Sequence, residues 1–256
     1  LVVVSGPFNI KRTRFMIDGK KVLGLVPARG GSKRLPRKNI LPFNGTPLIA
    51  WTIIAGLGSR FLDKIVVSSE DKEIQSVAAE HSADVIDRPS ELSSDSTGSV
   101  EVALHSLDYY ANQGEEFDYL ALMQPTSPLR ESWHIDDALT LIREKDARAV
   151  VGMCKTEHPV NWMGRIDQTL SMDRFIADKF VDGQKIGDGS LDYQINGAIY
   201  VIEVSELRNG RTFFPRRGTY AYVMRRDESI DIDTEYQFLL AEFVHRSQSM
   251  KRPCEN

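Results

Sequence analysis

The sequence predicts an α/β fold with a doubly wound, mainly parallel sheet that carries helices on both faces. Two observations support this prediction. Apolar runs of strand length alternate along the chain with runs of helix length. The strand candidates are continuous apolar runs rather than alternating ones, which is typical of parallel strands that are covered on both faces.

The first part of the chain supplies this alternation twice. VLGLV (22–26) and KIVVSSE (64–70) are predicted to be buried strands, the second rich in β-branched residues. We expect helices at 47–59, which ends in glycines, and at 71–83, which begins with acidic residues suited to a helix N-terminus. A short strand, ADVIDRP at 83–89, ends at a proline.

The same pattern continues to residue 154 and returns near residue 195. The later elements are expected as a helix at 97–114, a strand at 118–125, a helix at 132–146, a strand at 147–154, strands at 195–203 and 219–225, and a helix at 233–246. We therefore divide the chain into an extension at 1–20 that need not be ordered, an α/β domain at 21–154 and 191–250, and an insertion at 155–190.

The insertion at 155–190 breaks the pattern, because its apolar residues follow no period. These residues are Trp162, Met163, Met172, Phe175, Ile176 and Phe180. Left uncovered, they would form a larger apolar patch than soluble monomers usually expose, so we expect a dimerisation insertion and a homodimer. A substrate lid is the alternative.

Composition narrows the class of protein. The 256 residues carry a net charge of -4, with 36 acidic and 32 basic residues, so no nucleic-acid partner is expected. No apolar run approaches the length of a membrane span, so no membrane partner is expected either. The two cysteines stand far apart, which excludes a disulfide scaffold, favours a reducing compartment and leads us to expect a cytoplasmic protein.

One loop, VPARGGSKRLPRKN (26–39), concentrates positive charge directly after the first strand. It matches neither the P-loop nor the dinucleotide-binding glycine pattern. In open α/β sheets ligands bind where such a loop follows a strand, and a Gly-Gly turn lets backbone N–H groups approach an anion. We therefore predict a triphosphate site, with a solvated basic turn as the alternative.

Five blocks of the sequence occur together in one order. They are VPARGGSKRLPRKN, DRPSELSSDSTGS (87–99), LMQPTSPLR (122–130), NGAIY (196–200) and SIDIDTE (229–235). This set resembles the CMP-sialic acid synthetases, the N-acylneuraminate cytidylyltransferases, over almost the whole chain. The resemblance implies a Rossmann-like nucleotidyltransferase that moves CMP from CTP to the anomeric hydroxyl of a nine-carbon 2-keto acid sugar and releases pyrophosphate. A CMP-Kdo synthetase and a non-catalytic nucleotide-sugar binding subunit are the alternatives.

The resemblance implies roles for several polar residues. CTP-binding residues are expected to be Arg29, Lys33, Asn39, Arg88, Thr97 and Ser99, and catalytic residues Lys38, Asp231 and Asp233. Cations neutralise the triphosphate and the leaving pyrophosphate, while Arg88 is expected near the cytosine. The alternative for Arg88 is a surface ion pair with Asp87. Arg34 and Arg37 stand at variable positions of the motif, and we expect them to be solvated.

Asp231 and Asp233 are two residues apart and lie on one side of an extended segment. Carboxylate oxygens beside a triphosphate suit Mg²⁺, so the pair is predicted to bind this cofactor. The alternative is that Asp233 caps the last helix.

For the sugar, the resemblance implies contacts from five residues: Gln124, Asn196, Tyr200, Phe213 and Phe214. Ordinary core packing is the alternative for the two phenylalanines. The sequence departs from the sialic acid pattern at Gln194, where the family usually has arginine, and at QKIGDGSLDY (184–193). Lys185 is a candidate to replace one of these charges. A legionaminic-type acid is therefore a second candidate for the sugar.

Overall fold

The computed structural model describes residues 17–94, 97–179 and 192–251. Its main feature is a seven-stranded sheet with the order β5-β4-β1-β6-β8-β7-β9. The strands are β1 Val22–Pro27, β4 Lys64–Ser69, β5 Asp84–Asp87, β6 Tyr119–Leu122, β7 Ala149–Lys155, β8 Tyr193–Glu203 and β9 Thr219–Val223. β8 runs antiparallel to both of its neighbours, and the other pairs are parallel. The predicted mainly parallel sheet is confirmed.

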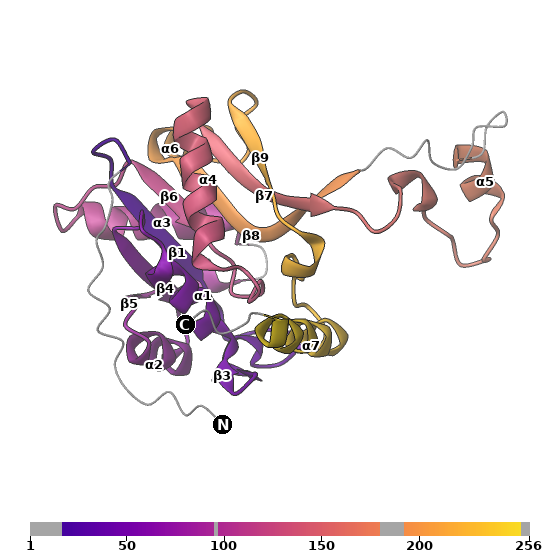
Figure 1. Cartoon of the computed structure of the whole chain (residues 1–256), viewed down its shortest axis with the longest axis horizontal. Helices are drawn as coiled ribbons and strands as arrows, with labels where there is room; N and C mark the ends of the chain where they lie inside the picture. Colours follow the sequence, from indigo (N-terminus) through magenta and orange to yellow (C-terminus); the bar gives the residue numbers. More distant parts are fainter. Residues whose placement is uncertain (1–16, 95–96, 180–191, 252–256) are drawn as a thin grey trace.

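Helices cover both faces of this sheet, as Figure 1 shows. α1 (Leu48–Gly58), α2 (Lys72–Glu80) and α4 (Ser132–Lys145) share one apolar cluster with the sheet. α3 (Ser99–Ala111) and α6 (Val204–Gly210) share a second.

Alternate residues of β1 supply the two clusters. Val22 and Val26 belong to the first cluster, whereas Leu23 and Leu25 belong to the second. All four side chains are fully buried, at 0% exposure. A strand covered on both faces therefore needs an unbroken apolar run, which is what the sequence contains.

A third apolar cluster fixes the C-terminal segment against β2 and α1. α7 (Glu235–Lys251) packs through Phe238 against Phe43 of β2 (Pro42–Phe43), which pairs with β3 (Thr46–Pro47). Short 3-10 helices lie at Lys38–Ile40, Ser90–Ser93, Val160–Trp162 and Arg226–Glu228. This packing brings the segment that precedes α7 to the ends of the strands.

The described part of the insertion forms an arm that projects away from the body and carries α5 (Asp173–Lys179) near its end (Figure 1). Trp162, Met163, Met172 and Ile176 are each about half exposed, at 50%, 50%, 46% and 50%. Phe175 lies over Gly164, where an added Cβ would meet its ring at 2.5 Å. Phe180 and Lys185 lie outside the described residues.

The predicted extension is described only from residue 17, and residues 1–16 lie outside the described part. Ile17 pairs with Lys20 in an isolated bridge, and its side chain is buried in the first cluster. The described end of this segment is thus attached to the domain core. In the described ranges, no helix is long and apolar enough to cross a membrane.

Candidate functional site

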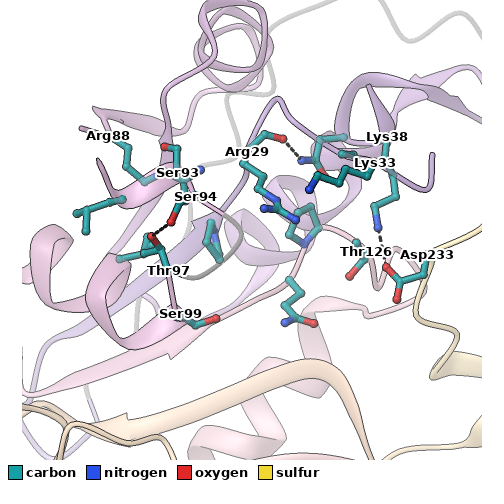
Figure 2. A pocket seen from close by; sticks show the side chains of 18 of the residues that line it. Arg29, Lys33, Lys38, Arg88, Ser93, Ser94, Thr97, Ser99, Thr126 and Asp233 are labelled. Carbon is teal, nitrogen blue, oxygen red and sulfur yellow. Dashed lines mark hydrogen bonds and ion pairs between the residues drawn. The ribbon is translucent and has the colours of Figure 1, made fainter. Parts of the chain in front are cut away.

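A cavity of about 620 Å³ opens at the carboxyl ends of β1, β5 and β6. Its walls come from the loops that follow these strands and from the segment before α7. Parallel strands bring their carboxyl ends to one edge of a sheet, and ligands of open α/β folds bind there. Figure 2 shows Arg29, Lys33 and Lys38 on one wall and Ser93, Thr97 and Ser99 on another.

Most of the predicted site residues line this cavity. They are Arg29, Lys33, Lys38, Asn39, Arg88, Thr97, Ser99, Gln124, Asp231 and Asp233. Four predicted sugar residues are not part of its lining, namely Asn196, Tyr200, Phe213 and Phe214. The structure therefore groups the predicted nucleotide residues in one cavity. Tyr200 lies near this cavity, since the charge of Asp231 adds to the rise that burial causes in the pKa of its hydroxyl.

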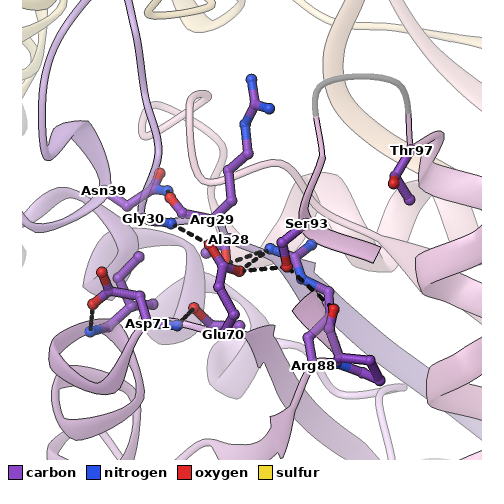
Figure 3. Close-up of polar contacts among 12 residues, drawn as sticks. Ala28, Arg29, Gly30, Asn39, Glu70, Asp71, Arg88, Ser93 and Thr97 are labelled. Atoms are coloured by element: carbon purple, nitrogen blue, oxygen red, sulfur yellow. Dashed lines mark hydrogen bonds and ion pairs between the residues drawn. The ribbon is translucent and has the colours of Figure 1, made fainter. Parts of the chain in front are cut away.

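Glu70, directly after β4, holds the basic loop in place (Figure 3). Its carboxylate accepts hydrogen bonds from the Gly30 backbone N–H at 2.8 Å, from Arg88 at 2.7 Å and from the Ser93 hydroxyl at 3.0 Å. Burial would raise the pKa of Glu70, but the hydrogen bonds from Arg88 and Gly30 outweigh it and hold the pKa below its ordinary value. The Gly30 N–H is thus directed at a carboxylate rather than at the cavity.

Glu70 was not among the residues predicted from the sequence. Its position after a buried strand, at the edge where ligands bind, is the signal that could have found it. Its partner Arg88 is buried and also donates to the Ala28 carbonyl at 3.0 Å. The alternative ion pair with Asp87 is wrong, because Asp87 lies on the outside and pairs with Lys72.

Each carboxylate oxygen of Asp233 pairs with a different cation. Lys38 donates to one at 3.0 Å, and Arg34 lies 2.7 Å from the other. Arg34 also lines the cavity, and its side chain is 68% exposed, so it is solvated as expected while it pairs with Asp233. Arg37 is 40% exposed, but its guanidinium pairs with Asp71 and Glu73 at the start of α2, so it is not simply solvated. Both arginines find carboxylates from distant segments, which their local sequence does not show.

Asp231 lies deeper than Asp233. Burial raises the pKa of Asp231 above its ordinary value and the neighbouring Asp233 adds to the rise, while a hydrogen bond from Thr126 and the charges of Lys38 and Arg34 oppose it. Among the described residues, its Oδ1 is a buried oxygen without a hydrogen-bond partner. A buried, unsatisfied carboxylate oxygen at a cavity wall is a position for a cation or a proton donor.

The described contacts at the start of α7 come from Thr234 and Gln237. The Gln237 side chain accepts from the backbone N–H groups of Asp233 and Thr234, both at 2.9 Å, and the Thr234 hydroxyl accepts from the Gln237 N–H at 3.4 Å. The Asp233 carboxylate instead meets Lys38 and Arg34. These contacts leave its charge directed at the cavity.

The wall opposite the cations is made of hydroxyl groups. Ser94 and Thr97 share a hydrogen bond of 2.8 Å, and Ser99 begins α3 nearby (Figure 2). Leu92 and Val102 add apolar surface to the same wall. Hydroxyl groups with apolar neighbours suit a flat polar ring better than a phosphate, so this wall fits the base of a nucleotide.

Gln124 and Gly197 meet at the floor of the cavity. Gly197 has a φ of +75°, and a Cβ added there would lie 2.5 Å from the Gln124 Oε1 and 3.5 Å from an Asp231 oxygen. Glycine is the residue that tolerates this backbone conformation and leaves room for the glutamine.

The remaining predicted sugar residues lie on β8 and in the segment between α6 and β9. Asn196 is buried, donates to Ser229 at 3.0 Å and to the Met224 sulfur at 3.2 Å, and accepts from the Ala198 N–H. Its described contacts are therefore structural. Tyr200 lies between Phe213 and Phe214, with ring centroids 5.9 and 6.1 Å away. Phe213 is buried and Phe214 is 49% exposed, so only the second presents its ring to solvent.

A family model described as cytidylyltransferase matches residues 23–169, more than half of the chain. The chain belongs to the cytidylyltransferase family. This confirms the family that the five sequence blocks predicted.

Several relatives of this chain have names that describe cytidylyltransferases or CMP-sugar synthases. It is 37% identical over 223 residues to an N-acylneuraminate cytidylyltransferase of Streptococcus agalactiae serotype V, which covers 86% of this chain and 52% of the relative. An Escherichia coli O18:K1:H7 protein of the same name is 31% identical, covering 91% of this chain and 54% of the relative. The chain thus spans about half the length of these two relatives. A CMP-N,N'-diacetyllegionaminic acid synthase of Legionella pneumophila is 31% identical, and the match covers 87% of this chain and 95% of the relative.

The fold has solved counterparts. A structure titled CMP:2-keto-3-deoxy-manno-octonic acid synthetase complexed with CTP superimposes with a TM-score of 0.66 and 13% identity, covering 89% of this chain and 99% of that one. At this identity the likeness concerns the fold alone. It confirms the predicted nucleotidyltransferase architecture.

Proposed function

We propose that the chain transfers CMP from CTP to the anomeric hydroxyl of an N-acylneuraminate or a related nonulosonic acid and releases pyrophosphate. One observation carries the proposal: a single cavity has cations on one wall, hydroxyl groups on another and a buried carboxylate between them. These walls suit a triphosphate, a base and a reacting α-phosphate. The family membership and the names of the relatives support the same reaction.

In this reaction the sugar oxygen attacks the α-phosphorus, the bond from the α-phosphorus to the bridging oxygen breaks, and pyrophosphate leaves with that oxygen. Lys38, Arg29 and Lys33 neutralise the triphosphate and the departing pyrophosphate. Gln124 at the cavity floor orients the sugar. Water or a carboxylate of the site accepts the proton of the sugar hydroxyl.

Asp231 and Asp233 fit Mg²⁺ as a cofactor. The buried Oδ1 of Asp231 lacks a partner among the described residues, and both carboxylates line the cavity. One or two carboxylates are the usual protein ligands of this ion, which takes its remaining ligands from phosphate oxygens and water. Among the described residues, no three or more His, Cys, Asp or Glu side chains are grouped so that they could hold a metal ion by themselves. When bound, the ion would neutralise charge on the phosphates.

The cofactor is tested with Asp231→Asn and Asp233→Asn. Both variants should lose Mg²⁺-dependent turnover, while CTP binding without metal, measured by calorimetry, persists. Turnover in both variants that responds to Mg²⁺ as in the natural chain would exclude the pair as its ligands. The amide keeps the shape of the side chain and removes the charge that a dication requires.

The reaction is tested by incubating the chain with CTP, Mg²⁺ and a panel of 2-keto acid sugars, with pyrophosphate as the readout. We expect release with N-acetylneuraminic acid or an N-acetylated legionaminic acid. Release only with Kdo would identify the alternative sugar. CTP binding without release for any sugar would favour a non-catalytic binding subunit. Because CTP is the donor, we expect the reaction in the cytoplasm.

We also propose that the chain works as a homodimer. The apolar side chains of the arm supply the support, since Trp162, Met163 and Ile176 are each 50% exposed on the projecting arm. Closed two-fold pairs are the commonest way for soluble proteins to cover such a surface.

A further inference from the structure

Arg130, in the loop between β6 and α4, has its guanidinium entirely inside the protein. The residue is 2% exposed and is the largest of the fully buried side chains. Its Nη1 donates to three backbone carbonyl oxygens, those of Ala198 at 3.1 Å, Gln124 at 3.2 Å and Ser127 at 3.4 Å. Its Nε and Nη2 are buried without a hydrogen-bond partner among the described residues.

No described carboxylate compensates this charge. The three acceptors are neutral carbonyl groups, and no ion pair joins Arg130 to a residue of the described ranges. Burial lowers the pKa of Arg130 to about 9, which still leaves the side chain charged at neutral pH. The neighbouring His134 does not supply a charge, since burial first and the Arg130 charge second lower its pKa to about 4.

An uncompensated buried cation needs a reason. Replacing buried ionic groups by apolar residues of similar size is often neutral or stabilising, so stability alone does not account for Arg130. Perturbed buried charges of this kind gather at functional sites.

The carbonyls that Arg130 holds belong to the floor of the candidate site. One is the backbone oxygen of Gln124, whose side chain lines the cavity. Another belongs to Ala198, which follows Gly197, the residue that makes room for Gln124. Arg130 itself is not part of the cavity lining. Its charge therefore acts on the cavity from one layer below, through protein of low dielectric where electrostatic interactions are strong.

We infer that Arg130 is a positioning residue that makes the Gln124 end of the cavity electropositive and thereby selects an acceptor carrying a carboxylate. This inference rests on the proposed function, in which the acceptor is a sugar acid. The acceptor carboxylate must enter a site that already contains Asp231 and Asp233. A fixed positive charge beneath the floor offsets their repulsion without contacting the substrate.

Two substitutions separate charge from hydrogen bonding. Arg130→Lys and Arg130→Gln both keep N–H donors on the side chain, but only lysine can carry a positive charge. Because burial lowers the pKa of a lysine, the two variants are compared at about pH 6, where lysine is charged. Each variant is assayed for pyrophosphate release with the sugar acid that serves as acceptor and with its carboxamide, which has the same shape and no charge. The readout is the ratio of kcat/KM for the acid to kcat/KM for the amide.

We expect Arg130→Gln to lower this ratio by about tenfold or more, which corresponds to about 1.4 kcal/mol. Arg130→Lys should stay within about threefold of the natural chain. An unchanged ratio in a folded Arg130→Gln variant overturns the inference, as does an equal loss of the ratio in both variants. Effects that weaken the fold or CTP binding act on both acceptors alike and cancel in the ratio.

A second measurement keeps this inference separate from the proposed function. The rise in melting temperature caused by N-acetylneuraminic acid and by its carboxamide is recorded for the natural chain and both variants. If the natural chain transfers CMP to no sugar, the proposed reaction fails, but a stabilisation by the acid that disappears only in Arg130→Gln still supports the role of Arg130. A stabilisation by the acid that is unchanged in Arg130→Gln contradicts it.

Discussion

Asp231 and Asp233 stand two residues apart but meet different surroundings. Asp233 is covered by two cations, Lys38 and Arg34, whereas Asp231 is buried and keeps one oxygen unpartnered among the described residues. Burial therefore disfavours the charged form of Asp231 and raises its pKa, while the Asp233 carboxylate is held in two ion pairs. A difference of this kind lets two neighbouring carboxylates take different roles.

The pH dependence of stability tests the burial of Asp231. Its pKa is raised in the folded chain, so this group favours folding at acidic pH, and that contribution is lost as the pH rises through the raised pKa. Without divalent ions, Asp231→Asn should thus melt above the natural chain at pH 8, and the difference should shrink as the pH falls toward about 4. Melting curves at several pH values measure this. A variant that melts lower at pH 8 would contradict it.

Lys38→Ala should reduce kcat by a factor of about 100, which corresponds to on the order of 3 kcal/mol for one lost charge-assisted contact in the transition state. Lys38 is 8% exposed and also donates to the Ile232 carbonyl, so we expect a melting temperature lower by a few degrees as well. Initial rates and melting curves are compared for both proteins. Near-natural turnover in a folded variant would exclude the phosphate role.

At the scale of single elements, the loop after β1 is held by groups from three other segments. Glu70 follows β4, Arg88 follows β5, and Ser93 lies in the 3-10 helix beyond it. Asn39, within the same loop, donates to the Arg29 carbonyl at 3.0 Å. The loop is thus fixed before any ligand arrives, which reduces the ordering that binding requires.

Glu70→Ala should destabilise the chain by about 2 kcal/mol, because it leaves the buried Arg88 charge without its carboxylate. This value lies below that of a fully buried pair, because Glu70 is partly exposed and water screens the interaction. We also expect a higher KM for CTP. Glu73→Ala is the matched control, since it removes an exposed carboxylate that pairs with Arg37 in the same region. Urea denaturation measures both, and equal losses of stability in the two variants would contradict the prediction.

The stabilisation from Glu70 should also depend on pH. Its pKa is lowered in the folded chain, so its contribution is fully present above the ordinary carboxyl range and is lost as the pH falls through the lowered value. The stability difference between the natural chain and Glu70→Ala should therefore narrow at acidic pH.

Gly197→Ala should raise the KM for the sugar, because the added Cβ displaces Gln124 from the cavity floor. Gly114→Ala is the matched control. Gly114 has a φ of +78° but nothing within 4 Å of an added Cβ. Both substitutions share the strain of about 1–2 kcal/mol for a left-handed residue, and only the first reaches the site. Similar KM values in the two variants would remove Gln124 from the sugar site.

At the scale of the whole molecule, the arm and the body differ in how they are held. The body has three buried apolar clusters, whereas the described arm exposes about half of each of its large apolar side chains Trp162, Met163 and Ile176. An arm of this kind gains stability only by packing on another surface.

We expect light scattering at micromolar concentration to give the mass of a dimer. Replacing Trp162 and Ile176 together by Glu should give a folded monomer, because two charges in an apolar interface are costly to bury. Tyr236→Glu is the control, as Tyr236 is 75% exposed on α7 and away from the arm. A monomeric natural chain would end the dimer proposal and return the arm to the alternative of a lid.

The sequence by itself determined the alternation of strands and helices, because each element carries a local apolar period that does not depend on its partners. It also determined where the charged loop lies, since a loop directly after a buried strand must emerge at the sheet edge. The ordered blocks, from VPARGG to SIDIDTE, identified the family.

Only the tertiary structure decided which groups meet. Lys38 and Asp233 are 195 residues apart in the chain, and Arg130 and Ala198 are 68 apart. A local sequence pattern does not show contacts between distant residues. The ion pairs of Arg34 and Arg37 and the role of Glu70 were therefore not predicted. The antiparallel direction of β8 could not be predicted from its residues either, because an apolar strand has the same pattern in either direction. Burial is likewise a property of the assembled core. Burial makes the surroundings of Asp231 differ from those of Asp233, and it places the charge of Arg130 beneath the cavity without a carboxylate partner among the described residues.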